Sequence, residues 1–440
     1  MSPVEISIIM VTVLMILIFL RMPIALAMAV VGAGGYIFLS GWLPLSAYLK
    51  TAIVDKYVSY DLAVIPLFIL MGQIATRTGI SRAIFTASNA WLGHWRGGLA
   101  MASVAGCAAF GSICGSSIAT ATTMGRVALP EMRRHGYSGA LGAGTLAAGG
   151  TLGILIPPSV VLIIYALLTE QNIVKLFLAA TIPGILAVLG FILAIAVYVR
   201  LFPEEGPAHA GLPLRERIRS LGGIWHVALV FIAVLGGIYG GVFTPAEGAS
   251  VGVILIALTG FLMRSLSIRG LFECVIDTAG TTAMIFAIIF GADLFNVALA
   301  LTRVPTMAAE WVGTAGIAPM TVLMAVILFY IVMGCIMDSL SMILLTVPVF
   351  FPAFMAMDFA MDPTHQALWF GIITLIVVEL GMITPPVGLN LFMISAMAPD
   401  IPTRKVFRGA VPFLMVEFLR IAIIVAFPAL TFWLVDIVIQ

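Results

Sequence analysis

Apolar runs long enough to cross a lipid bilayer recur along this chain from residue 4 almost to its end. A helix needs about 20 apolar residues to span the hydrocarbon core. The candidate spans are 4–20, 23–40, 62–76, 139–170, 175–200, 223–242, 246–263, 279–298, 366–397 and 409–435. Only 9% of the residues are charged, against about 25% in a soluble domain, so we expect an all-α polytopic membrane protein. Because apolar runs recur throughout, the first is expected to be a retained helix and not a signal peptide.

Two further apolar stretches, 98–128 and 318–356, are interrupted at their centres by clusters of small and polar residues. The clusters run from Gly111 to Ser117 and from Gly334 to Ser341. Each half-stretch is too short to span comfortably, so we expect two re-entrant hairpins that enter and leave on the same side. Non-helical backbone persists at membrane depth only where protein buries it or where it lines a water-filled cavity.

The distribution of basic residues gives an orientation for these segments. Lys and Arg gather in cytoplasmic loops. With both hairpins returning to their own side and the N-terminus outside, sixteen of the 21 Lys and Arg residues fall inside. Counting either hairpin as a span destroys this asymmetry, so we expect both termini to lie outside.

Matching motifs divide the chain into two halves. The motif from Gly153 to Pro158 matches that from Gly381 to Pro386, and Gly111 matches Gly334. We therefore expect a first repeat at 1–200, a cytoplasmic linker at 201–222 and a second repeat at 223–440. Each repeat has five crossings, one of them a broken helix (139–170 and 366–397), and one hairpin (98–128 and 318–356). An odd number of crossings turns the second half upside down, which is an inverted repeat.

The same repeat predicts which parts move. Alternating access in repeat-built carriers is largely rigid-body movement of one bundle against another. We expect the hairpins and broken helices to slide as one unit against a scaffold formed by 4–40 and 223–263. Two stretches that mix charged and apolar residues, 45–59 and 268–278, are expected to be interfacial helices that tether the moving part.

A doubled proline breaks one span in each half, at Pro157-Pro158 and Pro385-Pro386. Proline removes a backbone donor and clashes with the preceding turn, so each pair opens its helix. Backbone groups near Gly153, Gly381 and neighbouring residues then lose their helical partners. Broken helices that face hairpin tips are how secondary transporters build ion sites.

Two similar cation sites are therefore expected, with an organic anion between the hairpins. In the first, the tip residues Gly115, Ser116 and Ser117 face the break at Pro157 and Pro158. In the second, the tip residues are Asp338, Ser339 and Ser341. They face the residues at and after the second break, which are Thr384, Pro385, Pro386 and Asn390. Close helix packing remains an alternative role for the small residues among them.

Four charged residues also lie within apolar segments: Asp293, Glu379, Glu417 and Arg420. Such groups are functional hypotheses by default. Glu417 and Arg420 are spaced to pair on one helix face, which another subunit would cover. Glu379 either lines the second site or pairs locally, and the sequence leaves both readings open.

Several motifs make the chain recognisable, in this order: Ile65-Pro-Leu-Phe-Ile-Leu-Met-Gly72, Gly115-Ser-Ser-Ile-Ala-Thr120, Pro130-Glu-Met-Arg-Arg-His-Gly-Tyr137, Leu155-Ile-Pro-Pro-Ser159, Thr244-Pro-Ala-Glu-Gly248 and Thr384-Pro-Pro-Val-Gly-Leu-Asn390. Over essentially its whole length the chain resembles the large membrane subunit of tripartite ATP-independent periplasmic (TRAP) transporters. Cys114 departs from the family pattern, which more often has a hydroxyl residue there.

This resemblance implies a sodium-coupled, elevator-type importer of an organic acid. We expect it in the bacterial inner membrane, with both termini periplasmic as the distribution of basic residues predicts. The resemblance implies two partners, a small four-helix membrane subunit and a periplasmic solute-binding protein. It also implies sodium sites at the hairpin tips and broken helices. A four-carbon dicarboxylate, a sugar acid and a keto acid all remain open as substrates.

Other functions find little support in the residues. The four cysteines and five histidines have no metal-ligand spacing, so we expect no metal besides sodium and no organic cofactor. A P-loop and a nucleophile elbow are absent from the sequence, which argues against an ATP-driven pump and an intramembrane enzyme. The net charge of +1 does not favour nucleic acid as a partner. A stand-alone sodium/dicarboxylate carrier of similar architecture remains the competing hypothesis.

Overall fold

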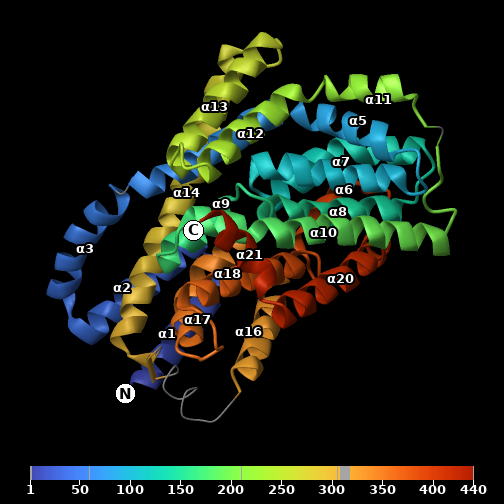
Figure 1. Cartoon of the computed structure of the whole chain (residues 1–440). Helices are drawn as coiled ribbons and strands as arrows, with labels where there is room; N and C mark the ends of the chain where they lie inside the picture. The colour runs from blue at the N-terminus through green and yellow to red at the C-terminus, as the bar shows by residue number, and fades with distance from the viewer. Residues whose placement is uncertain (1, 59, 210, 305, 308–317, 440) are drawn as a thin grey trace.

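The computed structural model describes residues 2–58, 60–209, 211–304, 306–307 and 318–439, without the side chains of 52–56 and 61. Every regular element in these ranges is a helix (Figure 1). The helices are α1 (Pro3–Phe19), α2 (Ile24–Ser40), α3 (Trp42–Tyr57), the 3₁₀ turn η1 (Tyr60–Ala63), α4 (Val64–Arg77), α5 (Ile80–Leu92), α6 (Gly98–Cys114), α7 (Ser117–Arg134), α8 (Gly139–Leu155), α9 (Val160–Thr169), α10 (Ile173–Leu201), α11 (Leu214–Leu221), α12 (Trp225–Tyr239), α13 (Pro245–Leu262), α14 (Ile268–Leu301), α16 (Pro319–Gly334), α17 (Ser339–Met355), α18 (Pro363–Met382), α19 (Leu389–Met397), α20 (Thr403–Ala426) and α21 (Ala429–Val438).

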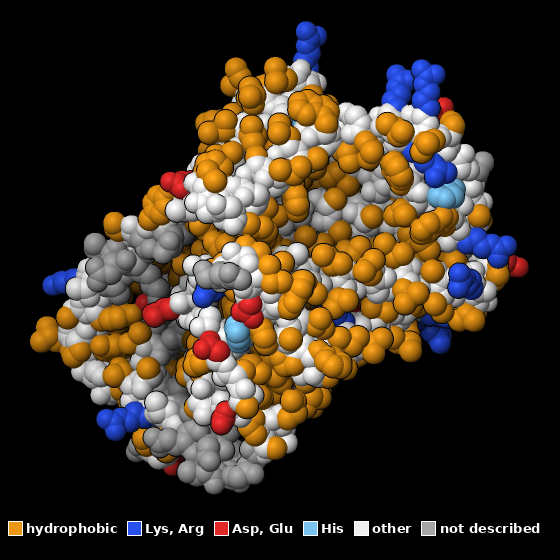
Figure 2. Space-filling view, in the orientation of Figure 1, with side chains coloured by type: hydrophobic (Ala, Val, Ile, Leu, Met, Phe, Trp, Pro, Cys, Tyr) orange, Lys and Arg blue, Asp and Glu red, His pale blue; other side chains and the backbone are white. Residues whose placement is uncertain are grey.

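Five of the described helices, α10, α13, α14, α18 and α20, are long and apolar enough to cross a membrane. Three bent pairs also qualify when each is counted as one span: α4 with α5, α8 with α9, and α11 with α12. Figure 2 shows hydrophobic side chains over most of one face, with Lys and Arg mainly at its upper and right-hand edges. The expected all-α, multi-pass membrane architecture is confirmed.

The helices fall into two packed groups (Figure 1). In the first group α2 packs along α14, and α4 packs on α13 and α14. The α2–α14 contact is close: a Cβ added at Gly32 would lie 2.4 Å from the backbone nitrogen of Phe295. In the second group α8 packs against α6, α7 and α20, while α18 packs against α16 and α17.

The order of elements repeats along the chain. A helix pair (α1 and α2, then α12 and α13) precedes a hairpin (α6 and α7, then α16 and α17), and a broken helix follows (α8 and α9, then α18 and α19). Each hairpin crosses its broken helix at two glycines. A Cβ at Gly111 would lie 2.4 Å from the Cα of Gly153, and one at Gly381 would lie 2.5 Å from the Cα of Gly334. The matched glycines of the sequence are therefore matched crossing points.

The prediction of a separate tether helix at 268–278 is wrong. The stretch 268–278 is not separate from the span at 279–298, because α14 is one continuous helix. Ser267 caps its start by accepting a hydrogen bond from Gly270 N at 3.0 Å, and no proline interrupts it. Arg77 at the end of α4 pairs with Glu273 at 2.6 Å, which holds this first part of α14 against the same group of helices. The other predicted tether, 45–59, corresponds to α3, although residue 59 lies outside the described residues.

Three further details differ from the sequence prediction. The linker 201–222 contains α11, which packs against α5. Helix α5 itself was not among the predicted spans; it follows α4 after a bend of 68°. The last predicted span, 409–435, is two helices, since α20 ends at Ala426 and α21 begins after Pro428.

Candidate functional site

The first hairpin turns over two residues only. Helix α6 continues to Cys114, so Gly111 and Ser112 are helical and not part of the break predicted from the sequence. Gly115 adopts a left-handed φ of 64°, a conformation that favours glycine. Ser116 then caps α7, its hydroxyl accepting a hydrogen bond from Ala119 N at 3.4 Å. The free amides at the start of α7 therefore lie at this tip.

The first break lies directly against this tip. Helix α8 ends at Leu155, Pro157 and Pro158 follow, and Ser159 caps the start of α9. A Cβ on Gly115 would lie 3.4 Å from both the carbonyl oxygen of Pro158 and the backbone nitrogen of Val160. The predicted pairing of first tip with first break is thus present, and both prolines are buried.

Gly153 has a packing role in this arrangement. A Cβ there would lie 2.5 Å from Thr120 Oγ1 and 2.9 Å from the carbonyl oxygen of Ser116. The absence of a side chain at Gly153 is what lets α7 and α8 approach each other behind the tip. Gly381 allows the equivalent approach of α18 to Gly334 in the second half.

The second hairpin has a similar tip, with an acid as its cap. Helix α16 ends at Gly334, and Asp338 caps α17 by accepting a hydrogen bond from Ser341 N at 3.1 Å. The hairpin contacts its break through Cys335, whose carbonyl oxygen accepts from Gly388 N at 3.2 Å and whose Sγ lies 3.5 Å from Pro385 O.

The structure does not bring all the residues predicted for the second site together. Asn390 does not face the second tip, because its Nδ2 donates to Ala147 O in α8 at 3.2 Å. The Thr384 hydroxyl donates to Leu380 O in its own helix at 2.6 Å. Pro385 and Pro386 are exposed, in contrast to the buried prolines of the first break. The second break therefore differs from the first in both partners and burial.

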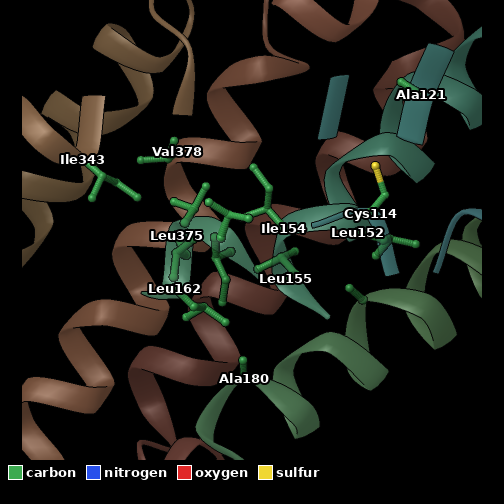
Figure 3. Packing of buried hydrophobic residues seen from close by; sticks show 14 of the residues in the cluster. Cys114, Ala121, Leu152, Ile154, Leu155, Leu162, Ala180, Ile343, Leu375 and Val378 are labelled. Atoms are coloured by element: carbon green, nitrogen blue, oxygen red, sulfur yellow. The ribbon is translucent and has the colours of Figure 1, made fainter. Parts of the chain in front are cut away.

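Both tips meet at one carboxylate. Ser117 Oγ donates to Glu379 Oε2 at 2.5 Å, and Ser339 Oγ donates to Glu379 Oε1 at 2.6 Å. Figure 3 shows Ile154 and Leu162 of the first broken helix beside Leu375 of α18, the helix that carries Glu379. Of the two readings that the sequence left open, local pairing and a place at the second site, the contact with Ser339 agrees with the second, and the contact with Ser117 adds the first tip.

A cavity of about 420 Å³ lies beside the two tips. Among the predicted site residues it is lined by Gly115, Ser116, Ser117, Asp338 and Ser339. The lining does not include the other nine predicted residues: Gly153, Pro157, Pro158, Ser341, Gly381, Thr384, Pro385, Pro386 and Asn390. Helices α4 and α14 supply further lining through Gln73, Thr76, Thr281 and their neighbours. The cavity therefore lies between the two groups of helices.

A family profile described as "Tripartite ATP-independent periplasmic transporter, DctM component" matches residues 11–430. The chain belongs to this family. It is 38% identical to the C4-dicarboxylate TRAP transporter large permease protein DctM of Pseudomonas aeruginosa, over 84% of this chain and 85% of that one. It is 30% identical to the sialic acid TRAP transporter large permease protein SiaM of Vibrio cholerae, over 86% and 87% of the two chains. It is also 30% identical to the ectoine TRAP transporter large permease protein TeaC of Halomonas elongata, over 98% and 99%.

A solved structure has the same fold at low sequence identity. The YdaH transporter of Alcanivorax borkumensis superposes with a TM-score of 0.64 over 89% of each chain, at 16% identity. The family resemblance expected from the motifs is confirmed. This chain is a TRAP transporter large permease subunit, and its relatives are named as transporter permeases and not as enzymes.

Sequence reasoning missed one basic residue in the cavity of this permease. Arg126 lines the cavity, and within the described part of the chain it has no ion-pair partner. It lies on α7, and three other α7 residues also line the cavity: Ala119, Thr122 and Thr123. The two threonines lie three or four residues after Ala119 and three or four residues before Arg126. That spacing places all four on the face of α7 that follows the tip. The spacing is visible in the sequence, where Arg126 is counted only as one of the sixteen basic residues expected inside.

The permease also contains a buried ion pair outside the cavity. Arg420 Nη2 and Nε donate to Glu417 Oε2, and Arg420 Nη1 donates to Pro183 O of α10 at 3.2 Å. The predicted pairing is present, but α10 of the same chain covers it, so no second subunit is needed there. Asp293 accepts a hydrogen bond from Tyr48 Oη of α3 at 2.5 Å, which joins α3 to α14.

Proposed function

We propose that this permease subunit imports an organic acid with sodium as the coupling ion, after a periplasmic solute-binding protein delivers the acid. The observation that carries the proposal is the convergence of two helix tips on one cavity. Each tip is a helix N-terminus with a serine at its first position, Ser117 or Ser339, and a capping oxygen from Ser116 or Asp338. In secondary transporters the unwound carbonyls and helix C-terminal ends beside such tips coordinate sodium, and the helix N-termini face the anionic substrate.

Sodium is the expected ion because of the atoms at the tips. The first tip offers hydroxyl and carbonyl oxygens, and the second adds one carboxylate from Asp338. Within the described residues, no group of three or more His, Cys, Asp or Glu side chains is placed to hold a metal ion. Oxygen donors with little negative charge favour a monovalent cation over a divalent one.

Arg126 supports an acid as the substrate. Its guanidinium is unpaired among the described residues, lines the same cavity and can bind a carboxylate with two parallel hydrogen bonds. The amide ends of α7 and α17 add positive partial charge at the tips. A small organic acid fits this combination in a cavity of about 420 Å³.

The remaining parts of the proposal rest on family membership and on the sequence pattern. The permease works with a small four-helix membrane subunit in the bacterial inner membrane, with both of its termini periplasmic. Its halves form an inverted repeat, and the hairpins with the broken helices move as an elevator against a scaffold that contains α2 and α14. The close α2–α14 packing and the location of the cavity between the two helix groups support this division.

Uptake by reconstituted vesicles tests the coupling. Vesicles that contain the permease and its small subunit should accumulate the acid only when the binding protein and an inward sodium gradient are both present. Uptake driven by a proton gradient with sodium absent would refute sodium coupling. Uptake without any binding protein would favour the alternative, a stand-alone sodium/dicarboxylate carrier.

Substitution of Arg126 tests the substrate class. Arg126→Gln should raise the substrate concentration for half-maximal uptake by roughly 10-fold or more, because a charge-assisted bidentate contact contributes about 1.5–3 kcal/mol. Arg134→Gln is the matched control, since Arg134 lies on the same helix but pairs with Glu131 on the surface. If the two variants transport alike, Arg126 does not bind the acid.

A further inference from the structure

The contact between Glu379 and the two tips has a regular geometry. Ser117 and Ser339 each occupy the first position of a tip helix, and they lie 222 residues apart, as do the caps Ser116 and Asp338. Each serine donates to a different oxygen of Glu379, at 2.5 and 2.6 Å. Each of the two carboxylate oxygens therefore accepts one serine hydroxyl.

All three groups are shielded from solvent. Glu379 and Ser117 are each 1% exposed, and Ser339 is 3% exposed. The other charged groups that act on Glu379 are the buried pair Glu417 and Arg420. The Ser339 hydroxyl also lies 2.8 Å from Met382 Sδ, but a thioether is a weak acceptor, so the carboxylate is the stronger partner of each serine hydroxyl.

The carboxylate has no counterpart in the first half. Aligning the two doubled prolines places Thr151 of α8 opposite Glu379 of α18. Thr151 Oγ1 donates to Ala148 O of its own helix at 2.6 Å and contacts neither tip serine by a hydrogen bond that the structure describes. One acid therefore serves both halves of an otherwise matched arrangement.

A serine hydroxyl has one proton and two lone pairs. When Glu379 accepts the hydrogen bond of each hydroxyl, the lone pairs of Ser117 and Ser339 point away from the carboxylate and are available to the cavity that both residues line. A cation needs lone pairs and is repelled by a hydroxyl proton. The carboxylate thus prepares both tips for a cation in the same way and at the same time.

We propose that Glu379 is a positioning residue that orients the tip hydroxyls Ser117 and Ser339 as sodium ligands and thereby couples the two sodium sites. This inference rests on the sodium-coupled function proposed above. Glu379 acts through the two serines and does not itself touch the ion. Sodium binding at one tip holds the serine of that tip in its hydrogen bond to Glu379. The carboxylate is then held in the orientation that the serine of the other tip needs.

Replacement by glutamine separates this role from simple packing. Gln has the same shape, but its amide offers one acceptor oxygen and one NH₂ donor. One serine can keep its orientation, whereas the other must accept a hydrogen bond and turn its proton toward the cavity. Glu379→Gln should therefore weaken sodium binding by roughly 10- to 100-fold, the usual effect of losing a residue that orients a metal ligand, and should abolish cooperativity between the sites.

The experiment measures binding of radioactive sodium to the purified full-length chain across a sodium titration. Thr151→Val is the matched control, because it removes a hydroxyl at the equivalent position that contacts neither tip, and its sodium curve should match the unchanged protein. Ser117→Ala added to Glu379→Gln should weaken binding by less than the product of the two single effects, because both act on one contact.

The outcomes are distinct. If the unchanged protein binds no sodium, the proposed function fails and this inference fails with it. If the unchanged protein binds sodium and Glu379→Gln binds it equally well and as cooperatively, only the positioning role is overturned. Should Glu379→Gln not fold, Glu379→Asp serves instead: a carboxylate shorter by one methylene cannot reach both serines, so cooperativity should again disappear. Retained cooperativity in that variant would also overturn the proposal.

Discussion

The glycine crossing of the second half offers the most direct test of how the hairpin is held. In Gly381→Ala the new Cβ would lie 2.5 Å from the Cα and 2.6 Å from the carbonyl carbon of Gly334. Carbon atoms in contact are normally about 3.5–4.0 Å apart, so α16 and α18 would have to separate by about 1 Å. Overpacking of this kind lowers the free energy of unfolding by about 1–3 kcal/mol.

The matched control is a glycine in an open position. A Cβ at Gly280 of α14 would meet nothing within 4 Å, so Gly280→Ala should be neutral or slightly stabilising. The assay is thermal unfolding of each detergent-purified variant, followed by uptake in vesicles. Gly381→Ala should melt several degrees lower than Gly280→Ala and transport slowly, because Glu379 lies half a turn away on the same helix. Equal melting temperatures and equal uptake would refute the close crossing of α16 and α18.

Three further predictions concern the first tip, the buried ion pair and the moving part. Ser116→Ala should raise the sodium concentration needed for half-maximal uptake and leave the amount of inserted protein unchanged; an unaltered sodium dependence would make Ser116 a packing residue only. Arg420→Met should reduce stability by roughly 3–5 kcal/mol because it leaves Glu417 buried and charged, and adding Glu417→Gln should restore most of it; a thermal melt in which the single variant matches the unchanged protein would contradict this. The third variant has cysteines in place of Thr281 and Thr122 in a cysteine-free background. Bridging these cysteines with a short bifunctional reagent should stop uptake but leave sodium binding intact. Normal uptake after bridging would show that α14 and α7 do not move relative to each other.

Much of the fold could be predicted because the membrane restricts what an apolar segment can do. Runs of about 20 apolar residues predicted most of the described long helices, and the doubled prolines at 157–158 and 385–386 located both breaks. The Gly and Ser clusters located both hairpin turns to within a few residues. These signals are local in the sequence, and each has a single physical cause.

The parts that could not be predicted depend on contacts between distant segments. Asn390 was assigned to the second tip because it follows the second break, yet its amide reaches Ala147 of α8. The sharing of Glu379 by two serines required the distances between three helices. The first part of α14, 268–278, mixes charged and apolar residues, and such a sequence is compatible with both an interfacial helix and the end of a long span. Its continuity with the rest of α14 depends on how it packs against α4.

The cavity is a seam between two bodies and not a pocket within one. Its lining comes from α4 and α14 on the one hand and from the two tips and α7 on the other. A ligand that binds residues of both groups at once joins them, and relative motion must break some of its contacts. We therefore expect small acids held by the tips alone to be transported. Larger analogues that also bind Gln73 or Thr281 should bind more tightly, be transported more slowly and act as inhibitors.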